Sequence, residues 1–208
     1  CDALGGGWNG QCAARARTAC CHLGTWRTCD NSRFVVTAME CDVGTELDGF
    51  TIVGSYFDYL HADDNPYSAG AGLLWDGGAA TIRNCAFRAN FSIGIIVKRA
   101  ATVALLDSSF HDHRPGSSTS LEGDSVLVRN CALFDSAIQL SISSPDATVR
   151  DCTFVGVAGA SIFGNATVDS CSFRDGVGLY LSDGRWTVTN SQFIGNSQHL
   201  AMLFGAGT

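Results

Sequence analysis

A seven-residue motif recurs along the chain at intervals too short to hold a separate domain. It reads TIRNCAF at 81–87, TVRDCTF at 148–154 and TVDSCSF at 167–173. Its last position is aromatic or leucine and recurs after 23, 23, 21, 19 and 20 residues. This column contains Phe87, Phe110, Leu133, Phe154, Phe173 and Phe193. A period of about 20 residues indicates a solenoid, in which the column becomes a stack of rings in the core.

Two further columns support this interpretation. Five residues before the ring column every residue is aliphatic (Ile82, Leu105, Val128, Val149, Val168, Val188), and two residues before it every residue is small (Cys85, Ser108, Cys131, Cys152, Cys171, Ser191). Each period holds three short apolar stretches separated by turn residues. Within them buried and exposed residues alternate, as in β-strands that have one solvent-exposed face. We therefore expect an all-β solenoid of about seven or eight coils over residues 34–208.

A column of Asn and Asp marks the sharpest turn of each coil. Its members are Asn84, Asp107, Asn130, Asp151 and Asn190, with Ser170 as the weakest. Asn and Asp tolerate a left-handed backbone, and their side chains can hydrogen-bond to the neighbouring coil. We expect a turn ladder here.

The repeats resemble those of the right-handed parallel β-helix proteins of the pectin-lyase-like superfold. Phe87-Arg88-Ala89-Asn90 and Phe193-Ile194-Gly195-Asn196 are also similar to the FxxN motif of polymorphic outer-membrane proteins. The resemblance covers roughly residues 34–208. It implies the fold and leaves the function open.

The ten cysteines are concentrated near the start of the chain. Cys1, Cys12, Cys20, Cys21, Cys29 and Cys41 are expected to form disulfides, and residues 1–33 to form a cysteine-rich N-terminal cap. Their spacing does not match paired zinc knuckles, so we expect no metal and no cofactor. Cys85, Cys131, Cys152 and Cys171 are expected to be buried thiols.

This cysteine content favours an extracellular or cell-surface location. Two sequons, at Asn90 and Asn165, are candidate glycosylation sites. The net charge of −7 argues against nucleic acid as a partner, and no apolar run is long enough to span a membrane. Because no polar capping segment follows the last repeat, we expect the coil edges to meet other chains or copies of this one.

Three arginines, Arg83, Arg129 and Arg150, share an outward column. In pectate-lyase-like enzymes an exposed arginine acts as the base beside calcium-binding aspartates, so this column is the alternative catalytic site. The loop residues His111 and His113 are candidates for a metal or sugar site, against the simpler interpretation of a solvated loop.

The sequence thus supports two functions. The favoured one is a non-catalytic structural or adhesive module of a larger surface or fibre-forming protein. The alternative is a polysaccharide-active, lyase-like or carbohydrate-binding domain that uses the arginine column. Whether the chain is an enzyme stays uncertain, with the balance against it.

Overall fold

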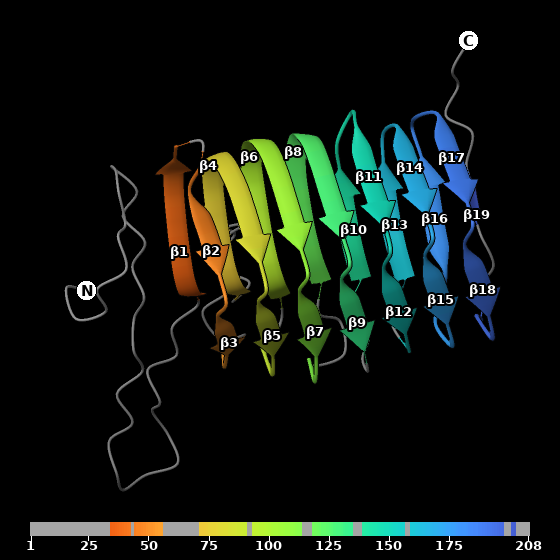
Figure 1. Ribbon diagram of the computed structural model, residues 1–208, viewed down its shortest axis with the longest axis horizontal. Coiled ribbons are helices and arrows are strands. Elements are labelled where there is room, and N and C mark those ends of the chain that lie inside the picture. Colours follow the sequence, from red (N-terminus) through yellow and green to blue (C-terminus); the bar gives the residue numbers. More distant parts are fainter. Residues whose placement is uncertain are drawn as a thin grey trace, which may run out of the picture.

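The chain folds into a β-solenoid in which each coil contributes three straight segments (Figure 1). The computed structural model describes residues 34–42, 44–55, 71–90, 93–113, 118–134, 139–156, 159–197 and 201–202. All regular structure in these ranges is β-strand, and every strand pairing is parallel. The predicted all-β parallel solenoid is therefore confirmed. The predicted cap, residues 1–33, lies outside the described residues.

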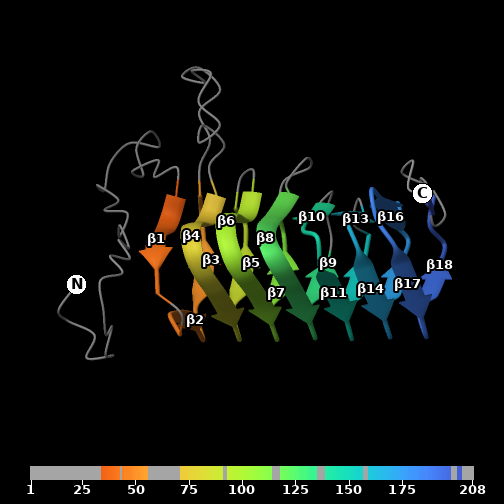
Figure 2. The same cartoon turned by 90° about the horizontal axis from the view of Figure 1, so that it is seen from above.

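The first segments of successive coils lie side by side in one large sheet (Figure 2). They are β1 (Phe34–Cys41), β4 (Ala71–Arg83), β6 (Ile93–Leu106), β8 (Ser118–Arg129), β10 (Gln139–Ser143), β13 (Gly159–Phe163), β16 (Leu179–Ser182) and β19 (Ala201–Met202). Three of these strands, β4, β6 and β8, continue through a bend into the second segment. Beyond the bend the second segments are β2 (Glu46–Asp48), the ends of these three strands, β11 (Ala147–Arg150), β14 (Ala166–Asp169) and β17 (Trp186–Thr189).

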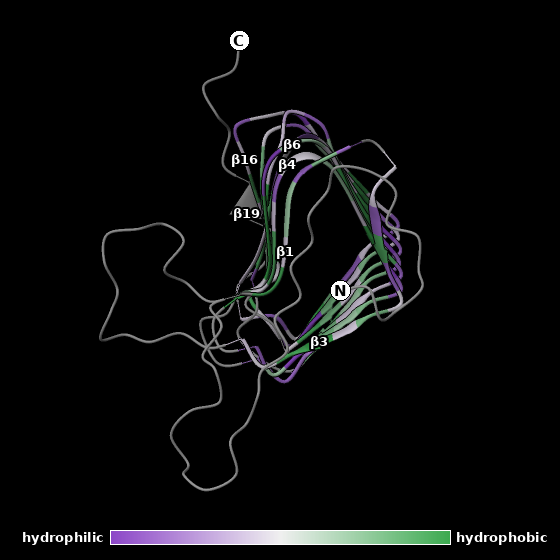
Figure 3. Cartoon of the chain, turned by 90° about the vertical axis from the view of Figure 1, so that its left-hand side faces the viewer, coloured by the Kyte–Doolittle hydropathy of each residue, from purple (hydrophilic) through white to green (hydrophobic). Residues whose placement is uncertain are grey.

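A sharp turn separates the second segments from the third, which form a seven-stranded sheet. These strands are β3 (Thr51–Val53), β5 (Ala86–Arg88), β7 (Ser109–His111), β9 (Ala132–Phe134), β12 (Thr153–Val155), β15 (Ser172–Arg174) and β18 (Gln192–Ile194). Viewed along the solenoid, the three segments enclose one hydrophobic interior (Figure 3). No helix that could span a membrane occurs among the described residues.

The ring column stacks as the third segments pair. Phe87 and Phe110 lie 5.0 Å apart, Phe154 and Phe173 4.6 Å, and Phe173 and Phe193 4.9 Å, with nearly parallel planes. Leu133 separates the two sets of rings, in register with Phe110 and Phe154. The column begins one coil earlier than the motif suggested, at Ile52, which pairs with Phe87.

Burial differs between the two ends of the described solenoid. In the first coil, Leu47 and Ile52 are only 4% and 2% exposed. In the last, Trp186, Val188 and Phe193 pack against the core but are only partly buried. The described residues thus cover the core less completely at β17 and β18 than at β2 and β3.

Candidate functional site

The sharp turn between the second and third segments requires a left-handed backbone in every coil. Asn84, Asp107, Asn130, Asp151, Ser170 and Asn190 all have φ between 49° and 56°. The N–H groups of the first five donate to the next coil, as from Asn84 to Leu106 O at 3.2 Å. The side chains do not form one continuous ladder, because Asn130 Nδ2 reaches Asp107 at 2.7 Å whereas Asn190 Nδ2 reaches Asp169, in the neighbouring outward column.

The small column has a second requirement besides size. Each of its members donates its S–H or O–H to the backbone carbonyl two residues earlier, as Cys152 does to Arg150 at 3.1 Å and Ser108 does to Leu106 at 2.7 Å. The other members are Cys85, Cys131, Cys171 and Ser191. Each of these carbonyls also accepts a backbone N–H from the preceding coil, so the side chain adds a second hydrogen bond to it. A short side chain with a donor makes this bond and leaves room for the rings, which explains why every member is cysteine or serine.

The four cysteines of this column are buried free thiols, as predicted. Burial raises the pKa of Cys85. The hydrogen bond between Cys131 and Cys152 lowers the pKa of Cys131 and raises that of Cys152 to about 12. The hydrogen bond to Cys152 and burial raise the pKa of Cys171. Most of this stack therefore stays protonated, and poorly nucleophilic, at neutral pH.

The FxxN motif has a defined structural task. Asn196 donates Nδ2 to Phe173 O at 2.9 Å and accepts the N–H of Gly176 at 3.0 Å, so it clamps its coil to the previous one. His113 occupies the equivalent position after Phe110 and makes one such bond, from Nε2 to Phe87 O at 3.0 Å. Its Nδ1 is buried without a hydrogen-bond partner.

His113 is therefore part of the solenoid interior. It is 4% exposed, and burial lowers its pKa. His111 lies outside, half-buried, with Nδ1 2.8 Å from the Asp112 carboxylate. The two histidines considered for one loop site thus face different environments. In the residues that the structure covers, no group of three or more His, Cys, Asp or Glu is placed to hold a metal ion.

The three arginines of the outward column do not form a single cluster. Arg83 is held by Glu46 and Asp48 of the preceding coil, each at 3.0 Å. Leu106 occupies the next position, and Arg129 and Arg150 then lie beside each other in register. Asp169 and Thr189 continue the column. Sequence spacing identified the column, but the ion pairs of Arg83 come from residues too far away in the chain for spacing to indicate them.

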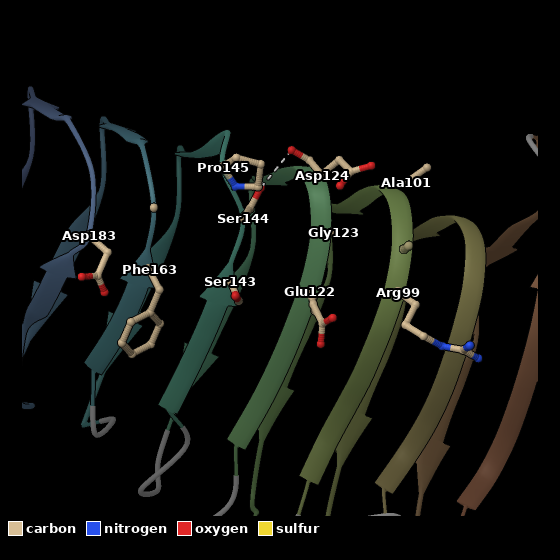
Figure 4. Close-up of a pocket in the computed structure, with 12 residues that line it drawn as sticks. Arg99, Ala101, Glu122, Gly123, Asp124, Ser143, Ser144, Pro145, Phe163 and Asp183 are labelled. Carbon is tan, nitrogen blue, oxygen red and sulfur yellow. Dashed lines mark hydrogen bonds between the residues drawn. The ribbon is translucent and has the colours of Figure 1, made fainter.

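A hollow that the sequence did not indicate lies at the bend between the first and second segments (Figure 4). It has a volume of about 600 Å³ and spans several coils. Its charged lining residues are Arg99, Glu122, Asp124 and Asp183, and Phe163 contributes an aromatic ring. Phe163 is 39% exposed and tilts against Tyr180 with ring centroids 6.0 Å apart.

The hollow follows from unequal bends. The strands β6 and β8 run through the bend without interruption. In a later coil the strand is interrupted at the bend, where β13 ends and Gly164 and Asn165 lead into β14. Gly164 is required there, since its φ is +116° and a side chain would overlap Ser144 O. Figure 4 shows Glu122, Ser143, Phe163 and Asp183 in a row across successive coils. This arrangement offers carboxylates, a hydroxyl and an aromatic face to an extended polar ligand.

The two sequons differ in accessibility. Asn90 is fully buried, donates to Ile52 O and accepts from Ser55 N, so a glycan at its Nδ2 is incompatible with the folded coil. Asn165 is exposed at the bend, where Nδ2 donates to Pro145 O and Oδ1 accepts from Arg185 N. A glycosylated amide keeps one N–H, so Asn165 can carry a glycan and still make this bond.

The predicted disulfide cysteines fall largely outside the described residues. These are Cys1, Cys12, Cys20, Cys21 and Cys29. Cys41 lies at the end of β1, is 1% exposed, and is not among the free thiols.

The comparisons with known proteins identify the fold. The family model for the right-handed β-helix region matches residues 44–208. The chain matches no curated protein and no solved structure at a significant level. The match covers all three segments of nearly every described coil.

Proposed function

We propose that this chain, which belongs to the right-handed β-helix family, is a non-catalytic structural or adhesive module of a larger extracellular protein. The observation that carries this proposal is the uniform task of each repeated position. From Leu47 to Val188 the aliphatic column stays in register, and the rings, turns and small donors repeat beside it. The repeated residues therefore serve stacking of coils, which is what a rigid spacer or display scaffold needs.

The arginine column supports a non-catalytic role. A lyase base has to be within reach of the proton that it removes and be free to accept it. The guanidinium of Arg83 is engaged by two carboxylates, and Leu106 separates it from Arg129. Arg83 is therefore not free to act together with Arg129 and Arg150 on one substrate position, which counts against a lyase site made of all three arginines.

The cysteines and Asn165 support an extracellular or cell-surface location. Cys41 is buried and not free, and we propose that it pairs with a cysteine of residues 1–33. Such a bond would fasten a cap to the first coil. Asn165 is the proposed glycosylation site.

We further propose that coil edges contact other chains or copies of this one. At the C-terminal side of the described coils, Trp186, Val188 and Phe193 expose part of their apolar surface next to the strand edges of β17 and β18. A partner strand placed there would bury these side chains and pair the edge.

Negative-stain electron microscopy of the native, full-length protein tests this role. Rods, filaments or ordered sheets are the expected result. Dispersed compact particles, together with cleavage of a polyuronate by the purified chain, would overturn the non-catalytic proposal.

A second candidate, carbohydrate binding, is favoured by the hollow at the bend. Phe163 offers a stacking face, and Glu122 and Asp124 offer hydroxyl acceptors. Glycan-array binding by the chain would support it, with loss in Phe163→Ala and retention in Phe134→Ala, an equally exposed ring on another face. Equal binding by both variants would exclude the hollow as the site.

A further inference from the structure

Two arginines lie side by side on the second segments without a counter-ion. Arg129 of β8 and Arg150 of β11 pair in register, so their side chains leave the sheet from neighbouring strands, about 4.8 Å apart. Neither forms an ion pair with any residue that the structure describes. Like charges at directly paired positions destabilise a sheet. This pair is therefore unfavourable in the isolated chain and would be relieved by an external anion.

The nearest carboxylates of the same chain are already engaged. Asp169 follows Arg150 in the column, but its oxygens accept hydrogen bonds from Thr189, Asn190 and Ser170. The bonds from Thr189 and Asn190 hold the pKa of Asp169 below its usual range. Asp107, in the turn column, accepts from Asn130.

The same two coils carry free carboxylates at the opposite end of the second segment. Asp124 lies at the bend of β8 and Asp146 directly before β11, and both are exposed. Neither side chain makes an ion pair within the described ranges. Each of these coils thus presents an acid at its bend and an arginine at its turn.

Between these ends the outer surface is flat and mostly small. We call it the middle face, defined by the outward row Thr81, Ala104, Leu127, Thr148, Thr167 and Thr187. The row is aligned coil by coil, without a bulge on this segment. Two such faces could approach closely, since only Leu127 projects a large side chain.

We propose that two copies of the chain pack by their middle faces, about a two-fold axis that runs along the solenoid. This axis keeps the order of the coils and reverses the strand direction across the contact. Arg150 of one copy then faces Asp146 of the other, and Arg129 faces Ser125 and Asp124 at the bend. Each contact occurs twice, as a two-fold interface requires. The proposal rests on the structural role proposed above and names its partner surface. Asn165 follows Asp146 in the outward row, so the dimer forms between chains that carry no glycan at Asn165, and the test uses the unglycosylated chain.

The size of the face predicts a weak dimer. The six strands that carry the middle face span about 24 Å, and a face of this width buries at most on the order of 1,000 Å² in both copies together. Association is therefore expected at micromolar concentrations. Because charge pairs contribute, it should weaken as salt is raised.

Sedimentation equilibrium of the full chain tests the proposal by measuring the dimer dissociation constant. Protein concentrations from about 1 to about 200 µM bracket the expected Kd. The wild type is expected to dimerise. Arg129→Asp with Arg150→Asp, and separately Asp124→Arg with Asp146→Arg, should each raise Kd at least about tenfold. In the chain carrying all four substitutions the acidic and basic positions have changed places, so the charge pairs across the contact are restored and the chain should dimerise again.

The matched control is Arg88→Asp with Arg174→Asp, which makes the same charge change on exposed arginines of the third segments. It should leave Kd unchanged, and circular dichroism verifies that each variant keeps its β-structure. A monomeric wild type, or a fourfold variant that stays monomeric, would overturn the dimer. Filaments of the full-length protein in that case would leave the structural role standing, so the two proposals fail separately.

Discussion

The side-chain amide of Asn90 joins two coils: its Nδ2 donates to Ile52 O at 3.2 Å, and its Oδ1 accepts the N–H of Ser55 at 3.1 Å. Asn196 makes the equivalent pair of bonds near the other end of the described solenoid. His113, at the same position in the coil after that of Asn90, makes only one. The position is a clamp, and the histidine fills it incompletely.

His113 should therefore make the solenoid sensitive to acid. Its pKa is lowered in the folded state, so the unfolded chain binds the proton more readily. The stability from the neutral ring is present above the unfolded pKa of about 6.5 and is lost as pH falls below it. His113→Asn should remove this loss from a series of melting curves between about pH 8 and 5, and His111→Asn should not. The same pH slope in wild type and His113→Asn would contradict this assignment.

Substitutions at Cys152 should separate size from hydrogen bonding. Cys152→Ser keeps a donor for Arg150 O and should change the unfolding free energy by less than about 1 kcal/mol, as Ser108 and Ser191 occupy the same column. Cys152→Val removes the donor and adds volume between two stacked thiols, so it should cost about 1–3 kcal/mol. Urea unfolding under reducing conditions measures both. A valine variant as stable as the serine variant would show that the donor has no role.

Asn130 should show the cost of its left-handed backbone. Its φ is 51°, and its Nδ2 donates to Asp107. Asn130→Gly loses only the side-chain bond, whereas Asn130→Ala also places a Cβ in the left-handed region and should be less stable by about 1 kcal/mol than the glycine variant. Thermal unfolding of the two variants gives the difference directly. Equal stability would mean that the turn relaxes without its left-handed residue.

Thr119 is a position where a substitution is expected to stabilise the fold. Its side chain is fully buried, and its Oγ1 has no hydrogen-bond partner. Thr119→Val keeps the shape and removes the unpaired hydroxyl, so it should raise the unfolding free energy by about 1 kcal/mol. Thr148→Val, the same exchange on the outer surface, is the control and should have a much smaller effect. A destabilised Thr119→Val would indicate that the hydroxyl is satisfied in solution.

The fold could be predicted from the sequence because the core residues recur with the period of one coil. One coil cannot bury its own apolar surface, so Phe87 and Phe110 had to recur at equivalent positions, and their spacing gave the register. The first coil was also accessible to this reasoning, since Leu47 precedes Ile52 by the same five residues that separate Ile82 from Phe87.

The contacts between coils were harder to predict. The motif showed that Cys152 is small and not that it donates to Arg150 O, because the bond depends on the geometry of the turn. A sequon identified Asn90 by its neighbours in the chain, whereas its burial depends on a residue 38 positions earlier, Ile52. The hollow beside Phe163 arises from the difference in bend between coils, which a period does not reveal.

The backbone hydrogen bonds between coils all point roughly along the solenoid, as the bonds from Asp107 N to Arg129 O and from Asn130 N to Arg150 O illustrate. A pull along this direction loads only the bonds of one coil at a time, so the molecule would yield by peeling, at low force and in steps of one coil. A pull across the solenoid would instead load the strands of many coils in parallel. The solenoid would therefore be mechanically anisotropic, and the force needed to unfold it would depend on where the load is attached.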